Sequence, residues 1–216
     1  MRGAAVEHAA AIHAAIERVY SVTPPPDLHL DAAGKTDIEI AREILVACNV
    51  PPGEIADGRS EFRLACVEEY ARLVPADLSD KVVPGIPELL DELDARADVA
   101  LSLVTGNLEP IARLKLARAG LGNLFPRGQG GFGSDDEDRA ALPAIARARM
   151  GSPTQPHPRE RTWVIGDTPR DITCARADDV RVLCVATGPY SVTELQEADG
   201  VAAGPAELRE LLAAEL

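Results

Sequence analysis

A short apolar run that ends in a glycine and an aspartate places the strongest constraint on how this chain folds. Residues 163–165 (Trp-Val-Ile) are β-forming and make a run short enough for one buried strand. Gly166 interrupts the run, and Pro169 suits the first turn of a helix. The sequence therefore predicts a strand, a tight turn and a helix in that order, with Asp167 on the turn.

Asp167 and Asp171 both lie near the start of this predicted helix. In an open parallel sheet, ligands bind at the edge where strands end and helices begin. Two carboxylates at that edge favour a hard cation such as Mg²⁺, which takes oxygen ligands and keeps several waters. A structural interpretation is equally open, in which Asp167 is the N-cap and Asp171 is a first-turn helix charge.

Strand candidates alternate with helices throughout the second half of the chain. The strand candidates are residues 99–104, 130–133, 162–166, 180–186 and a weak one near Val201. Helical spacing of apolar residues marks the segment after Pro87 and the segments 110–119, 139–150 and 205–216. Such alternation gives right-handed βαβ units, so we predict a doubly wound, parallel α/β sheet of the Rossmann-like kind.

The first part of the chain has a different pattern, which predicts helices only. Apolar residues follow helical spacing in segments 5–20, 38–45 and 60–73. Thr36 and Glu39 have the spacing of a capping box, and Gly120 is placed to end the later helix 110–119. The pattern changes at residues 83–85, so we predict a helical domain over residues 1–82 and an α/β domain over residues 83–216.

Charge and cysteine content limit the partners of this chain. A net charge of −13 argues against nucleic acid and against an anionic membrane as the main partner. No apolar stretch is as long as a membrane span, and no signal-peptide pattern precedes the first helix. The 4 cysteines are scattered and give no zinc-site spacing. We therefore expect a cytoplasmic protein.

A second predicted strand also ends in residues with suitable chemistry. Thr105, Gly106 and Asn107 follow the apolar run 99–104. A hydroxyl followed by a glycine at a strand-to-helix turn suits phosphate, because free N–H groups and the helix dipole both favour an anion. Thr105 acting only as a cap is the alternative. The pairing of this turn with the turn at Asp167 makes the pattern specific.

These two motifs give the chain its resemblance to a known family. Residues 104–107 (Val-Thr-Gly-Asn) and 165–171 (Ile-Gly-Asp-Thr-Pro-Arg-Asp) are similar to the second and fourth motifs of haloacid-dehalogenase-superfamily hydrolases. Pro84-Gly85 resembles the return from cap to core in the phosphoglycolate-phosphatase-like branch, which carries a helical cap. Residues 34–37 (Gly-Lys-Thr-Asp) resemble the cap loop that reaches over the active site.

The resemblance implies hydrolysis of a small phosphorylated metabolite, a phosphate monoester, through an aspartyl-phosphate. Thr105, Gly106 and the amide of Asn107 would hold the phosphoryl group. Asp167 would bind Mg²⁺ and Asp171 would support the water shell of the metal. The cation is needed because the nucleophile and the phosphate are both negative.

The resemblance also calls for a basic residue near the phosphate. Arg139 begins the helix after the third predicted strand and so lies at the functional edge. Lys115 is the other candidate, but it is about two turns into its helix, roughly 10 Å from the edge. We prefer Arg139. Lys35 is a candidate for contacting the leaving group, or else an ordinary turn residue before a capped helix.

The first family motif, an Asp-x-Asp at the end of the first core strand, is absent from the sequence. The nucleophile and the general acid/base would belong to it, and its strand would lie between those ending at Thr105 and Asp167. Each apolar side chain buried by such a strand contributes roughly 1.5–3 kcal/mol. Total stability is typically only about 5–15 kcal/mol. We therefore expect the reading frame to begin upstream.

Three functions follow from these observations. The first is a Mg²⁺-dependent phosphatase whose activity depends on the missing strand. The second is a non-catalytic module that binds phosphate and metal, and the third is a haloacid dehalogenase. The pair Asp167 and Asp171 argues against the dehalogenase, which uses no metal. Neither the substrate nor the oligomeric state follows from the sequence.

Overall fold

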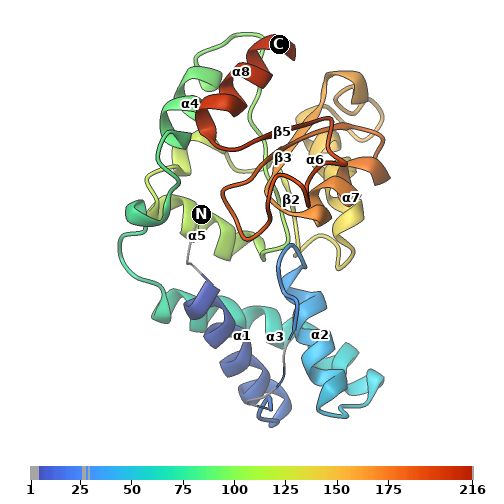
Figure 1. The fold of residues 1–216 in the computed structure, drawn as a ribbon. Helices are drawn as coiled ribbons and strands as arrows, with labels where there is room; N and C mark the ends of the chain where they lie inside the picture. The colour runs from blue at the N-terminus through green and yellow to red at the C-terminus, as the bar shows by residue number, and fades with distance from the viewer. Residues whose placement is uncertain (1–4, 26–27, 29, 216) are drawn as a thin grey trace.

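The N-terminal part of the protein is a layer of helices, as the sequence predicts. The computed structural model describes residues 5–25, 28 and 30–215. Helices α1 (Ala5–Tyr20), α2 (Asp37–Ala47) and α3 (Pro52–Leu73) form this layer, which lies below the rest of the molecule in Figure 1. We call them the helical layer. Helix α3 begins at Pro52, eight residues before the predicted start, because Pro51 is its N-cap and a proline such as Pro52 fits the first turn of a helix.

The rest of the chain alternates strands and helices. The elements are α4 (Ile86–Asp94), β1 (Val104–Thr105), α5 (Glu109–Arg118), β2 (Gly131–Phe132), α6 (Leu142–Met150), β3 (Trp163–Gly166), α7 (Pro169–Ala177), β4 (Arg181–Val185), β5 (Gly200–Ala202) and α8 (Pro205–Glu215). Short 3₁₀ turns lie at Ser79–Lys81, Gly122–Leu124, Arg139–Ala141 and Arg159–Arg161. None of the helices in the described part of the chain is long and apolar enough to cross a membrane.

All paired strands run parallel, which confirms the α/β class, but the strands form two separate sheets. Strand β1 pairs with β2, and β3, β4 and β5 pair in that order. Both faces of the larger sheet are covered. Leu183 and Val185 of β4 pack with α4 and α8, whereas Val182 and Cys184 pack with α7. This alternation is what a doubly wound sheet requires.

A cavity of about 620 Å³ separates the two sheets. One wall is formed by residues 99–104 and the other by residues 163–165 of β3, and leucines of α4 and α8 also line it. We call it the central groove. Ile165 is 44% exposed, and the buried hydroxyl of Ser102 has no hydrogen-bond partner among the described residues. The groove therefore lies at the position predicted for the missing strand.

The groove explains why one predicted strand is much shorter than expected. Residues 99–104 were predicted to be a strand, but only Val104 and Thr105 pair as one. A strand needs hydrogen-bonding neighbours. The side of this segment that faces β3 borders the groove. The prediction was thus correct in position and wrong in extent.

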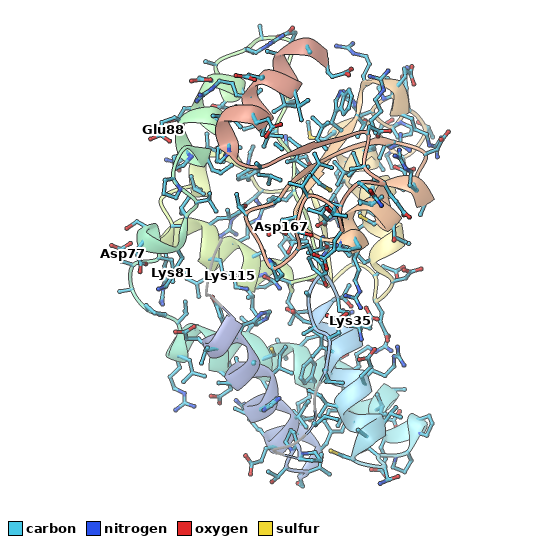
Figure 2. All side chains as sticks on the ribbon, viewed as in Figure 1. Lys35, Asp77, Lys81, Glu88, Lys115 and Asp167 are labelled. Carbon is cyan, nitrogen blue, oxygen red and sulfur yellow. The ribbon has the colours of Figure 1, made fainter. Side chains whose placement is uncertain are left out.

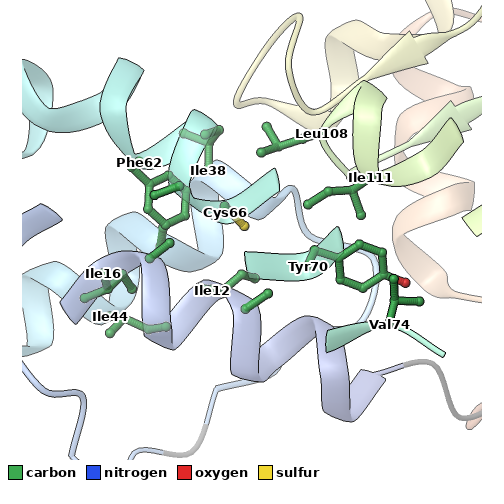
Figure 3. Close-up of a cluster of buried hydrophobic side chains, with 14 of the residues drawn as sticks. Ile12, Ile16, Ile38, Ile44, Phe62, Cys66, Tyr70, Val74, Leu108 and Ile111 are labelled. Atoms are coloured by element: carbon green, nitrogen blue, oxygen red, sulfur yellow. The ribbon is translucent and has the colours of Figure 1, made fainter. Parts of the chain in front are cut away.

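The largest hydrophobic cluster joins the helical layer to the α/β part. It contains Ile12, Ile16, Phe62 and Tyr70 of the layer and also Leu108 and Ile111 at the start of α5 (Figure 3). Helix α5 therefore packs its apolar face on the helical layer. The two parts meet at the level where Lys35 and Asp167 lie (Figure 2).

Candidate functional site

The turn between β3 and α7 is held by a complete capping box. The N-cap of α7 is Thr168, whose hydroxyl accepts the Asp171 amide, and the Asp171 side chain accepts the Thr168 amide at 3.0 Å. Asp167 is therefore not the N-cap, and that part of the structural interpretation was wrong, whereas Asp171 is an acidic residue of the first turn, as that interpretation predicted. Thr168 takes this position because a residue three before an acidic residue can exchange hydrogen bonds with it.

Asp171 is almost entirely occupied by these contacts. Asp171 is 6% exposed, and its carboxylate accepts hydrogen bonds from the amide of Asp167 at 3.1 Å and from the hydroxyl of Thr168 at 2.9 Å. Its other oxygen forms a close ion pair with the guanidinium of Arg139. Arg139 thus reaches the functional edge, as predicted, and its Nε is buried without a partner in the described chain.

Asp167 lies beside this network. Burial and the neighbouring charge of Asp171 raise the pKa of the Asp167 carboxyl. A cation would relieve both effects, so this carboxylate fits a Mg²⁺ that takes its other ligands from water and substrate. The described residues contain no group of three His, Cys, Asp or Glu side chains placed to hold a metal. The fit therefore rests on a single direct ligand.

The turn between β1 and α5 is tightly packed. The hydroxyl of Thr105 accepts the amide of Asn107 at 3.3 Å. A Cβ added to Gly106 would lie 2.1 Å from the carbonyl oxygen of Lys35, so only glycine fits this position. The sequence motif Thr-Gly-Asn thus forms a compact turn that packs directly against the 34–37 loop.

Lys115 also reaches this turn. Its ammonium donates to the Asn107 side-chain oxygen at 2.7 Å and lies 5.3 Å from the ring centre of Tyr70. Burial lowers the pKa of Lys115. Lys115 is therefore closer to the edge than its position along the helix predicted, because side chains on a helix point back toward its N-terminus. Both basic candidates therefore lie at the edge, on different turns.

The 34–37 loop contacts both turns. Gly34 has φ +76°, and a Cβ there would lie 2.9 Å from the hydroxyl oxygen of Thr168. Since Lys35 covers Gly106, the loop lies over the ends of β1 and β3 together. The ammonium of Lys35 pairs with Glu43 at 2.6 Å. Figure 2 shows Lys35, Lys115 and Asp167 near this junction.

Two residues of this junction gave no usable signal in the sequence. His8 of α1 lies 3.1 Å from Asp37, and Glu137 pairs with Arg42 and with Arg59 at 3.0 Å. A lone histidine on an amphipathic helix and one residue of an acidic loop are common on protein surfaces. Only the packing of the helical layer on the α/β part brings them to the site.

The structure is thus an α/β fold of parallel strands in which a helical layer packs on the turns that follow β1 and β3. The sequence matches the model of the haloacid dehalogenase-like hydrolases over residues 9–176, and the chain belongs to this family. A comparison with curated proteins finds no match.

Solved structures support the same fold. A hydrolase from Pseudomonas syringae shares 19% identity, with a TM-score of 0.62 and coverage of 96% of this chain and 91% of that one. A β-phosphoglucomutase from Clostridium difficile shares 15% identity, with a TM-score of 0.67 and coverage of 98% and 90%. CbbY from Rhodobacter sphaeroides, solved with phosphate, shares 16% identity, with a TM-score of 0.62 and coverage of 94% and 88%.

Proposed function

We propose that this protein is a Mg²⁺-dependent hydrolase of a small phosphate monoester. The observation that carries the proposal is that one loop, residues 34–37, packs on both the Thr105–Asn107 turn and the Asp167–Thr168 turn. A phosphoryl group and a cation could therefore be held side by side beneath it. Phosphate in the CbbY structure is consistent with this chemistry.

Each side chain has a role that follows from its contacts. The Thr105 hydroxyl and the N–H groups of Gly106 and Asn107 would bind the phosphoryl oxygens, and the Asn107 N–H would give up its hydrogen bond to the Thr105 hydroxyl to do so. Asp167 would hold Mg²⁺, which supplies neutralisation of charge as the phosphoryl group moves. Asp171 would act indirectly, because its oxygens already bind Arg139 and the turn. Arg139 would place a positive charge close to Asp167 and the phosphoryl group, through its ion pair with Asp171.

The two parts of the chain and its two lysines would also have distinct roles. Residues 1–82 would be a cap and residues 83–216 the core. Lys115 would hold Asn107 rather than touch the phosphate, because its ammonium already donates to that side chain. Lys35 would reach the leaving group only by exchanging its pairing with Glu43. All four cysteines are free thiols, as expected for a protein that works in the reducing environment of the cytoplasm.

The nucleophile would come from a strand that fills the central groove. The groove is lined by apolar residues of the two strand segments that end at the proposed site and by leucines of α4 and α8, with charged side chains such as Arg147 and Arg161 also on its lining. An apolar strand lying there, parallel to β1 and β3 and ending in an aspartate, would bring a carboxylate to the functional edge. The aspartate would attack phosphorus and release the alcohol, and water would then hydrolyse the aspartyl-phosphate.

The test compares two forms of the protein on p-nitrophenyl phosphate. One form is this chain, and the other carries an N-terminal extension with an apolar strand ending in Asp-x-Asp. We expect Mg²⁺-dependent turnover by the extended form alone, and its loss in the extended Asp167→Asn variant. Turnover that is equal without Mg²⁺ would contradict the proposal.

A second candidate is a module that binds phosphate without catalysis. It is favoured by the engagement of Asp171 in the capping box and the Arg139 pair, which leaves Asp167 as the single direct metal ligand in the described chain. Binding of inorganic phosphate without turnover by either form would support it. Mg²⁺-independent release of halide from a 2-haloacid would instead support the dehalogenase.

A further inference from the structure

Asp37 is the most deeply buried acidic side chain at the contact between the helical layer and the α/β part. It is the first residue of α2, and none of it is exposed to solvent. Its carboxylate accepts the side-chain N–H of Asn107 at 3.1 Å and the main-chain N–H of Leu108 at 2.7 Å. These donors belong to the turn that follows β1, so a side-chain amide and a main-chain N–H of the α/β part hydrogen-bond a buried carboxylate of the helical layer.

Further contacts connect Asp37 to the same turn. Its own amide donates to the carbonyl of Gly106 at 2.8 Å. The Nε2 of His8 lies 3.1 Å from its carboxylate. The Asn107 side chain is held at both ends, since its oxygen accepts from Lys115 at 2.7 Å. We call Asp37, His8, Asn107 and Lys115 the Asp37 clamp.

The Asp37 clamp restricts the conformation of the turn at residues 105–108. A buried carboxylate that loses its donors pays the full desolvation cost, so the donors and the carboxylate hold each other in one geometry. Moving the helical layer away would break the bonds to Gly106, Asn107 and Leu108 together. The turn would then lose the contacts that fix the Asn107 side chain and the direction of the neighbouring N–H groups.

We propose that Asp37 is a positioning residue that sets the 105–107 turn through the contact of the helical layer with that turn. The packing of the two parts and the geometry of the turn are then coupled. This inference rests on the proposed function only where it concerns phosphate: an anion that binds the shaped turn stabilises the packed arrangement by its differential affinity. The coupling between the two parts requires the carboxylate of Asp37 and not merely a side chain of its shape.

Asp37→Asn tests this requirement. The amide has nearly the shape of the carboxylate, but it presents an N–H group where N–H donors converge, so at least one bond at the clamp is lost. Asp57→Asn is the matched control, because Asp57 is an exposed aspartate of α3 in the same layer. The measurement is amide hydrogen exchange by NMR on the folded chain.

We expect Asp37→Asn to speed exchange at the amides of both Asp37 and Leu108 by about tenfold or more, equal to about 1.4 kcal/mol. Amides of β4, far from the clamp, should keep the exchange rate of the wild type, which shows that the variant is folded. Asp57→Asn should change none of them. Unchanged exchange at Leu108 in folded Asp37→Asn protein would overturn the inference.

Inorganic phosphate separates this inference from the proposed function. Added phosphate should protect the 34–37 loop and the 105–108 turn together in the wild type, and this joint protection should be lost in Asp37→Asn. If phosphate has no effect on the wild type while Asp37→Asn still loosens both segments, the proposed function fails and the positioning role stands. Protection of the turn without the loop would refute the coupling.

Discussion

At the scale of single residues, Asp171 serves folding first. Its carboxylate completes the capping box of α7 and pairs with Arg139, and almost none of it is exposed. The spacing of Asp167 and Asp171 predicted two carboxylates at one helix start, which is correct. It could not distinguish a metal-supporting residue from a capping residue, because both interpretations place an acid in the first turn.

Asp171→Ala should destabilise the protein by about 3–5 kcal/mol, since it leaves the Arg139 guanidinium partly buried without its anion. Urea unfolding measures the change. Asp98→Ala is the control, because Asp98 pairs with Arg96 on the open surface, and its midpoint should not move. Equal midpoints for the two variants would show that the Asp171 pair contributes nothing to stability.

Position 106 must be a glycine because the 34–37 loop leaves no space for a side chain there. Gly106→Ala would drive a methyl group into the Lys35 carbonyl and should cost about 1–3 kcal/mol through forced displacement of the 34–37 loop. Thermal unfolding reports the change. In Gly53→Ala the added Cβ meets nothing within 4 Å, so this helical control should be unchanged or more stable. A neutral Gly106→Ala would refute the close packing of the loop.

At the scale of elements, the sequence predicted type and order well. The alternation of strands and helices and the switch near residues 83–85 follow from periodicity. The predicted extent of the strand at 99–104 was wrong, because the length of a strand depends on a hydrogen-bonding neighbour strand, which no local sequence pattern specifies. The reach of Lys115 was also missed, since it depends on how α5 directs its side chains toward the turn that precedes it.

Asp199 connects α7 to the β4–β5 sheet. Its carboxylate accepts from Arg176 of α7 and from the amide of Val182 at 2.7 Å. The hydrogen bond from Arg176 holds the pKa of Asp199 below its ordinary value of 3.8. The bonded carboxylate therefore stabilises the fold above pH 3.8, and this contribution is lost as the pH falls through the lowered, folded-state pKa.

Asp199→Asn should accordingly lower the urea midpoint at pH 7, and the difference from the wild type should shrink below pH 3.8. Glu210→Gln, an exposed change on α8, serves as control and should leave the pH profile unaltered. A difference that is constant from pH 7 to pH 3 would contradict the assignment of the pKa shift to Asp199.

At the scale of the whole molecule, the division into two sheets dominates. The chain has a single tryptophan, Trp163, which lines the central groove and lies 4.7 Å from the guanidinium of Arg181. A strand that fills the groove would replace water by hydrocarbon around this ring. We expect the extended form to emit at shorter wavelength and to unfold at higher temperature than this chain.

Tryptophan fluorescence and thermal unfolding measure both effects. The control extension has the same length, with lysines in place of the apolar residues, and should leave emission and unfolding temperature unaltered. If the apolar extension also changes neither, the groove does not accept a strand. The proposed nucleophile would then have no route to the site.

The apolar cluster that α5 shares with the helical layer has a practical consequence for anyone dividing the gene. If the chain were cut between residues 82 and 83, the C-terminal fragment would expose Leu108 and Ile111 to solvent. Both are buried in one cluster with Ile12 and Tyr70 in the intact chain. Either half expressed alone should therefore aggregate, and a soluble excised piece would have to take α5 with the first three helices. The position at which the sequence pattern changes, residues 83–85, would then differ from the position at which the chain can be divided into soluble fragments.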